Sequence, residues 1–267
     1  MNNIVKYVLV YMLFSTSNVL AGSFSFNSDG VNIHYNEVGD GVPVILIHGY
    51  TMNSGMWNDT ILYKTLSKKH RIITLDLRGH GLSDKPLKPR EYGPKVGEDV
   101  IKLMEHLKIK KAHLVGYSMG AYVVGRLAVT HPERILSATL VSGFFPFSDT
   151  DEDEYSEQTA RHMEAEAGVE GSEDKESIYA LAAVARGWKY DAVTDEQVAK
   201  VNLPMQAIFG SQEQNDMFKS QKYRFSLPSP SVTLVVIEGA DHDSNNAAVL
   251  SKKFTKSVEE LILKSAL

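Results

Sequence analysis

Short apolar runs alternate with amphipathic segments along the first half of the chain, and this alternation constrains the fold more than any other feature. The runs at 42–49, 71–79 and 111–118 are rich in Val, Ile and Leu. Each is followed by a segment whose apolar residues recur at helical intervals. This order is typical of βαβ units, which build a parallel sheet covered by helices on both faces. We therefore expect an α/β fold with a mostly parallel sheet flanked by helices.

The same pattern predicts the domain organisation. Further predicted strands bring the sheet to eight, and they cover residues 23–26, 31–38, 134–142, 203–210 and 231–239. Between residues 144 and 203 the alternation stops, and helical spacing at 176–188 indicates a helical insertion there. We expect a core formed by residues 22–143 and 204–267, with a short helical insertion at 144–203.

The first 21 residues have the pattern of an export signal. Lys6 precedes the apolar run 7–14, and the small residues Val19 and Ala21 fit cleavage after Ala21. The run is too short to span a bilayer as a helix. We expect an exported protein, periplasmic or secreted, with no stable membrane insertion after processing. A buried N-terminal strand or helix is the alternative interpretation.

The charge distribution bears on possible partners. The formal net charge of −5 offers no basic face, so we expect no nucleic-acid binding. Between Asp149 and Glu176, twelve acidic residues stand against Arg161 and Lys175. This stretch is interpreted as a solvated face, or alternatively as a negative surface that disfavours anionic substrates. The chain has no Cys, which excludes disulfides and thiolate metal sites.

A Gly-x-Ser-x-Gly pattern lies at the end of the strand predicted at 111–118. It is formed by Gly116, Ser118 and Gly120, and a helix predicted at 119–131 begins directly after the serine. Such a turn lifts the serine hydroxyl out of the sheet, and glycine removes side chains where strand and helix pass closest. The positive end of the helix dipole faces any anion that forms beside the serine. Ser118 is therefore the candidate nucleophile.

A serine nucleophile needs a histidine base and a carboxylate that orients the base. Of the nine histidines, His242 follows the last predicted strand, where loops converge at the carboxyl edge of the sheet. The acid is expected after the preceding strand. Glu213, three residues past Gly210, is the favoured acid, and Asp216 and Asp243 are the alternatives.

Two backbone N–H groups are expected to hold an oxyanion beside Ser118. Met119 offers one at the start of its predicted helix, and Tyr50 offers the other in the loop after the strand at 42–49. Gly49 allows that loop a close approach. His48 is expected to brace the loop rather than to react.

No cofactor or metal ion is expected. The cluster of Asp241, His242 and Asp243 lacks the spacing usual for metal ligands. The glycines at 39–41 precede a strand instead of opening a helix, so they do not form a phosphate-binding loop or a dinucleotide fingerprint.

These motifs together resemble the α/β-hydrolase superfamily over nearly all of residues 23–267, and most of all its esterase, perhydrolase and C–C-bond hydrolase branch. The segments that carry the resemblance are HGY (48–50), DLRGHGLSDKP (76–86), GYSMG (116–120), HPERI (131–135), LPMQAIFGSQE (203–213) and GADH (239–242). The chain order of serine, acid and histidine also matches. The resemblance implies a nucleophile at Ser118, a base at His242 and oxyanion donors at Tyr50 and Met119.

The resemblance has further implications and two departures. It implies that residues 144–203 form a cap over the mouth of the active site. It also implies a mainly structural motif formed by Asp76, Arg78 and His80. Glu213 stands where the family usually has Asp, and Ala240 stands where a glycine is commoner.

We therefore predict a cofactor-independent serine hydrolase that cleaves a small or medium carboxylic ester through an acyl-enzyme on Ser118. Hydrolysis of a C–C bond, lactone or amide by the same residues is the first alternative. A catalytically inactive binding protein with this fold is the second, motivated by Glu213 at the acid position. Relatives that open epoxides or displace halide use an Asp nucleophile, which the serine excludes here.

Overall fold

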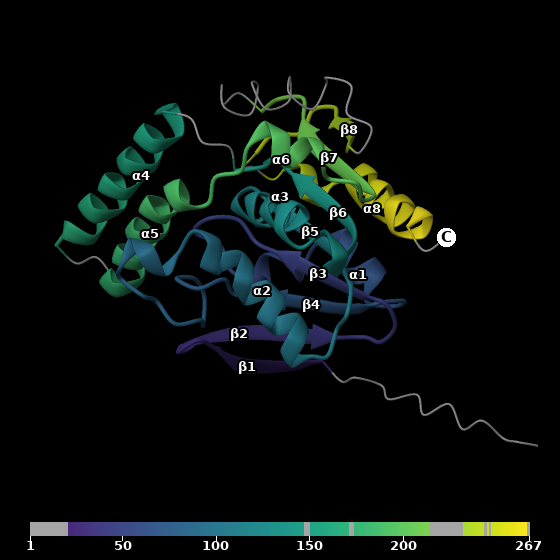
Figure 1. Ribbon diagram of the computed structural model, residues 1–267, viewed down its shortest axis with the longest axis horizontal. Coiled ribbons are helices and arrows are strands. Elements are labelled where there is room, and N and C mark those ends of the chain that lie inside the picture. Colours follow the sequence, from purple (N-terminus) through teal and green to yellow (C-terminus); the bar gives the residue numbers. More distant parts are fainter. Residues whose placement is uncertain are drawn as a thin grey trace, which may run out of the picture.

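An eight-stranded sheet forms the centre of the computed structural model, in the order β1-β2-β4-β3-β5-β6-β7-β8 (Figure 1). The structure describes residues 21–146, 150–170, 174–213, 232–242, 245 and 247–265. The strands are β1 (Gly22–Ser28), β2 (Val31–Val38), β3 (Pro43–Ile47), β4 (Arg71–Leu75), β5 (Ala112–Tyr117), β6 (Ile135–Val141), β7 (Met205–Gly210) and β8 (Val232–Ile237). The predicted mostly parallel α/β sheet is confirmed. Strand β2 pairs with β1 and with β4 in the antiparallel sense, and all other neighbouring strands pair in parallel.

The β1–β2 hairpin turns at Asp29 and Gly30, which both have positive φ angles, 49° and 88°. An Asp-Gly pair suits a two-residue turn of this kind, because its backbone twist matches that of the strands. The hairpin extends the parallel sheet by two strands and closes one edge of it.

Helices cover both faces of the sheet (Figure 1). They are η1 (Ser54–Trp57), α1 (Ile61–Leu66), η2 (Pro89–Glu91), α2 (Pro94–His106), α3 (Met119–Thr130), η3 (Pro132–Arg134), α4 (Thr150–Gly168), α5 (Lys175–Gly187), η4 (Trp188–Tyr190), α6 (Asp195–Ala199), η5 (Ala248–Leu250) and α8 (Lys252–Lys264). Side chains of β3 alternate between the two layers, since Ile45 and Ile47 join the cluster of α2 and α3, while Val44 and Leu46 join that of α1 and α8. Burial on both faces explains the continuous apolar run.

The amphipathic segment 55–69 contains two short helices, η1 and α1, instead of one continuous helix. Trp57 ends η1 fully buried, and Thr60 caps α1 by accepting a hydrogen bond from the N–H of Tyr63 at 3.1 Å. The Thr60 hydroxyl also donates to the carbonyl of Trp57 at 2.7 Å. A threonine that caps in this way starts a new helix.

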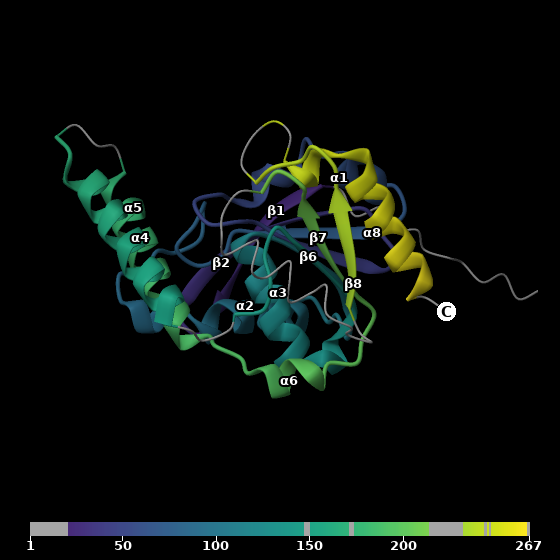
Figure 2. The ribbon, with the colours of Figure 1, turned by 90° about the horizontal axis from the view of Figure 1, so that it is seen from above.

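Between β6 and β7 the chain forms α4, α5, η4 and α6. Figure 2 shows α4 and α5 lying side by side and extending away from the sheet. Arg186 of α5 joins them by ion pairs to Glu157 and Glu164 of α4. Helix α4 covers most of the acidic stretch 149–176, in which apolar residues only weakly follow helical intervals. Arg186 lies outside that stretch and supplies positive charge to it.

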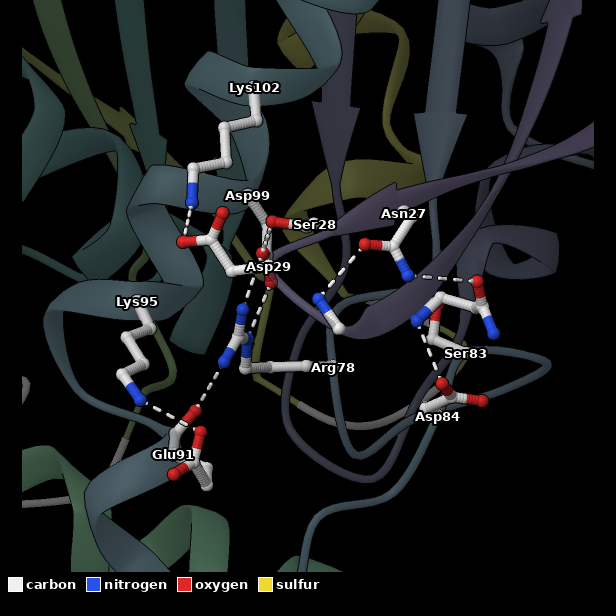
Figure 3. Close-up of polar contacts among 12 residues, drawn as sticks. Asn27, Ser28, Asp29, Arg78, Ser83, Asp84, Glu91, Lys95, Asp99 and Lys102 are labelled. Carbon is white, nitrogen blue, oxygen red and sulfur yellow. Dashed lines mark hydrogen bonds and ion pairs between the residues drawn. The ribbon is translucent and has the colours of Figure 1, made fainter.

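A buried ion pair connects the hairpin to the helix layer (Figure 3). The guanidinium of Arg78 donates to both oxygens of Asp99 at 2.6 Å, and the hydroxyl of Ser28 donates to Asp99 Oδ1 at 2.5 Å. Arg78 also donates to the carbonyl of Glu91 at 2.7 Å. Arg78, in the loop after β4, is thus bonded directly to η2 and α2. Through Asp99 it is also connected to Ser28 of β1.

The predicted export signal lies almost entirely outside the described residues, as do Asp216 and Asp243. Within the described ranges, no helix combines the length and apolar character needed to cross a membrane.

Candidate active site

Ser118 lies on a sharp turn between β5 and α3, with φ 52° and ψ −115°. A positive φ is costly for a residue with a side chain, and it survives only where neighbouring structure imposes it. A Cβ on Gly116 would lie 2.0 Å from the carbonyl oxygen of Gly120, and one on Gly120 would lie 2.3 Å from that of Ile47. The two glycines are therefore required sterically, because strand and helix pass in backbone contact on either side of the serine.

His242 follows β8, and its imidazole lies beside the serine. Its Nε2 is 3.1 Å from Ser118 Oγ, a hydrogen-bond distance between a potential base and a potential nucleophile. The structure thus brings the predicted nucleophile and the predicted base into contact.

Tyr117 holds His242 from the residue before the serine. The two rings stack with centroids 5.4 Å apart and an interplanar angle of 24°. The Tyr117 hydroxyl also donates a hydrogen bond to the backbone carbonyl of His242. Tyr117 therefore contacts both the ring and the backbone of the histidine. Its place next to the serine is the one signal in the sequence that points to Tyr117, which was not among the predicted site residues.

Glu213 lies buried beyond β7, with 7% of its surface exposed. One carboxylate oxygen, Oε1, accepts hydrogen bonds from the Ser142 hydroxyl at 2.6 Å and from the Gly210 N–H at 2.8 Å. Ser142 follows β6 and has a positive φ of 49°. The loop of Glu213 meets the loop of His242, since the Gln212 N–H donates to the carbonyl of Ala240 at 2.8 Å. The carboxylate is thus fixed at the same sheet edge as the histidine.

The two expected oxyanion donors flank Ser118. Met119 is the first residue of α3, and Tyr50 follows Gly49, whose added Cβ would lie 3.3 Å from the Cβ of Ser118. Among the described residues, neither the Tyr50 nor the Met119 backbone N–H is engaged by an acceptor. N–H groups at a helix start and in an adjacent loop are suited to bind an oxyanion.

His48 and His80 lie beneath the loop of Tyr50. His48 donates from Nδ1 to the Gly49 carbonyl at 2.7 Å and accepts at Nε2 from the Leu77 N–H at 3.0 Å. Burial lowers the pKa of His48, and burial lowers the pKa of His80 to about 3. Both rings are therefore neutral at pH 7, and His48 braces the loop, as expected.

Asp76 supports the same loop from the end of β4. Its carboxylate accepts from the Ser54 N–H at 2.7 Å and from the Leu82 N–H at 2.8 Å. In the part of the chain that the structure describes, no group of three His, Asp or Glu side chains is arranged to hold a metal ion.

The chain matches the alpha/beta hydrolase fold family over residues 42–238, and it belongs to that family. The non-heme chloroperoxidase of Streptomyces lividans is 38% identical over 132 residues, which are 47% of this chain and 47% of that protein. The putative non-heme chloroperoxidase of Synechocystis sp. is 36% identical over 122 residues, which are 45% of this chain and 44% of that protein. The match thus spans about half the length of these curated relatives.

Solved structures resemble nearly the whole chain at lower identity. A thermophilic esterase from Thermogutta terrifontis superposes with a TM-score of 0.71 and 19% identity, covering 93% of this chain and 100% of that one. E-2-(acetamidomethylene)succinate hydrolase gives a TM-score of 0.69 and 24% identity, covering 91% and 99%. These likenesses establish the fold, and the family with its enzyme-named relatives supports a hydrolase.

Proposed function

We propose that this protein is a serine hydrolase that cleaves a small or medium carboxylic ester through an acyl-enzyme on Ser118. The single observation that carries the proposal is the 3.1 Å approach of His242 Nε2 to Ser118 Oγ at the strained turn. A serine hydroxyl is a weak nucleophile at neutral pH, and a hydrogen-bonded imidazole activates it.

In the first half of the reaction, Ser118 Oγ attacks the ester carbonyl while His242 Nε2 accepts the hydroxyl proton. The carbonyl oxygen becomes an oxyanion, and the N–H groups of Tyr50 and Met119 stabilise it. Collapse of the tetrahedral intermediate breaks the C–O bond, and His242 returns the proton to the departing alcohol. A water molecule then attacks the acyl-enzyme by the same route and releases the acid.

Glu213 is proposed to orient His242 and to stabilise its protonated form. Its burial at the edge where the loops after β7 and β8 meet supports this role, as do the two donors that fix one of its oxygens. Asp216 remains the alternative acid.

We also propose a cap and an export signal. The segment 144–203 is proposed to act as a cap. The Tyr50 hydroxyl donates to the carbonyl of Leu181 at 2.8 Å and so links α5 to the loop of Tyr50. Export with cleavage after Ala21 is proposed from the sequence pattern alone.

The test uses the mature protein, an active-site-directed fluorophosphonate and a panel of nitrophenyl esters. Wild type should be labelled and should hydrolyse short esters, whereas Ser118→Ala should lose both properties. Ser257→Ala, which removes a serine on α8 outside the site, is the matched control and should keep both. An unlabelled wild type would favour the binding-protein alternative.

A further inference from the structure

A small cavity lies where η4 meets α2 and α3, next to the proposed oxyanion residues. It measures about 20 Å³, and its lining consists of Tyr92, Gly93, Val96, Met119, Tyr122, Val123, Val184, Trp188 and Asp191. Met119 directly follows Ser118, the proposed nucleophile. The ring of Trp188 packs edge-on against that of Tyr50, with the ring centroids 5.1 Å apart. The cavity is therefore lined by one of the proposed oxyanion residues, Met119, and its lining residue Trp188 contacts the side chain of the other, Tyr50.

Two polar atoms of the lining residues are buried without a hydrogen-bond partner. They are the indole Nε1 of Trp188 and the carboxylate Oδ1 of Asp191. Asp191 is 8% exposed. Its Oδ1 lies 3.4 Å from Arg126 Nε, an ion pair without hydrogen-bond geometry. A buried polar atom without a hydrogen bond costs about 1–3 kcal/mol, and here a donor and an acceptor belong to residues that line the same cavity, so a polar occupant that bonded to both would recover that cost.

Both groups are held in place independently of any occupant. Arg126 of α3 donates to the backbone carbonyls of Asp191 and Ala192 at 3.2 and 2.9 Å, which attaches the segment after η4 to the core. The Trp188 ring lies between Tyr50 and Tyr155, with the Tyr155 ring stacked at 6.4 Å. The cavity is thus preorganised, which lowers the entropic cost of binding there.

Size and chemistry together define the occupant. A cavity needs about 10–15 Å³ to hold one water molecule, so this one accepts a single group of that size. The rest of the lining is apolar, including Val96, Val123 and Val184. A hydroxyl group can donate to a carboxylate oxygen and accept from an indole N–H at once.

We propose that this cavity binds a hydroxyl group on the acyl chain of the substrate, which then donates to Asp191 Oδ1 and accepts from Trp188 Nε1. The inference rests on the proposed function and names its substrate class, the esters of short hydroxy acids. A buried water molecule is the competing occupant.

The kinetic test compares nitrophenyl esters of 3-hydroxybutyrate and butyrate. At pH 8, where the Asp191 carboxyl group is ionised, wild type should prefer the hydroxylated ester in kcat/KM by about 10- to 100-fold, as expected for hydrogen bonds that involve a charged group. Trp188→Phe and Asp191→Leu should each reduce this preference at least fivefold. Trp57→Phe is the matched control, because Trp57 Nε1 is likewise buried without a partner but belongs to the opposite layer. It should keep the preference.

A binding measurement makes the result independent of turnover. The chain has two tryptophans, so the Ser118→Ala/Trp57→Phe variant leaves Trp188 as the sole indole fluorophore. Methyl 3-hydroxybutyrate should change its emission at concentrations where methyl butyrate does not. Equal responses, or a kinetic preference unaffected by Trp188→Phe, would overturn the inference and identify a water site. Failure of the proposed function has a different signature, since neither ester is then hydrolysed and Ser118 is not labelled.

Discussion

The imidazole Nε2 of His242 lies 3.1 Å from the Oγ of Ser118, although the two residues are 124 positions apart in the chain. The contact exists because β5 and β8 end at the same edge of one sheet, so the loops that follow them meet. Ser118 reaches this edge on a strained turn and His242 on a loop stacked against Tyr117.

The strain at Ser118 predicts opposite effects on activity and stability. Ser118→Gly should abolish hydrolysis and should raise the free energy of unfolding above that of Ser118→Ala by about 1 kcal/mol. Glycine adopts a positive φ without steric cost, and part of this gain is offset by its greater entropy in the unfolded chain. Urea unfolding of both variants measures the difference. A Ser118→Gly variant less stable than Ser118→Ala would contradict it.

Glu213 should act on turnover more than on binding. Glu213→Gln should lower kcat by about 10²- to 10⁴-fold with a small change in KM, because the amide keeps the shape but loses the charge that is proposed to stabilise protonated His242. Asp216→Asn, the matched change at the alternative acid, should cost less than tenfold. Steady-state kinetics on one nitrophenyl ester compares them, and the reverse order would assign the acid to Asp216.

Tyr117 should act as a positioning residue through His242. Tyr117→Phe keeps the stacked ring but removes the hydrogen bond to the His242 carbonyl, so kcat should fall by about 2- to 13-fold, the equivalent of one such bond. Tyr117→Leu removes both contacts and should lower kcat further. The lower limb of the kcat pH profile should shift in Tyr117→Leu and stay near its place in Tyr117→Phe. Equal turnover in both variants and wild type would exclude the role.

The Arg78–Asp99 ion pair should contribute strongly to stability when one partner is removed. Asp99→Asn or Arg78→Met should each lower the free energy of unfolding by about 3–5 kcal/mol, since each leaves its partner buried and incompletely paired. The double variant should lose less than the sum of the single losses. A double-mutant cycle in urea measures this coupling, and strict additivity would show that the pair does not act as a unit.

Asp191 should make stability depend on pH. Burial raises the pKa of its carboxyl group from 3.8 to about 7, while the charge of Arg126 opposes that rise and the charge of Glu98 adds to it. The folded state therefore binds the proton more tightly than the unfolded state, and this stabilisation is lost as pH rises from about 4 through 7.

The matched variant Asp191→Asn removes that dependence and retains Arg126 and Glu98. Between pH 5 and pH 8, the unfolding free energy of wild type relative to Asp191→Asn should fall by about 2–3 kcal/mol. Unfolding in urea at a series of pH values provides the measurement. A constant difference between the two proteins would show that Asp191 has the same pKa folded and unfolded.

Much of the fold could be predicted because its determinants are local. Strands such as β3 are buried on both faces, and this burial requires an unbroken apolar run that is visible in the sequence. The turn at Ser118 requires Gly116 and Gly120 at fixed offsets, because backbone contact on both sides leaves no room for a Cβ. The division of the amphipathic segment 55–69 into two helices is harder to predict, because it depends on the side-chain cap at Thr60.

The sequence by itself determined the α/β architecture and the sharp turn around Ser118. It also determined the short set of residues from which the partners of Ser118 could come. Tertiary structure alone decided the contacts among them, because each depends on segments far apart in the chain that the sheet brings to one edge. Tyr117 stacks on His242, Ser142 fixes Glu213, and Asp191 and Trp188 line one cavity. Residue type permits such contacts, but no spacing encodes them, since the paired residues belong to different strands and loops.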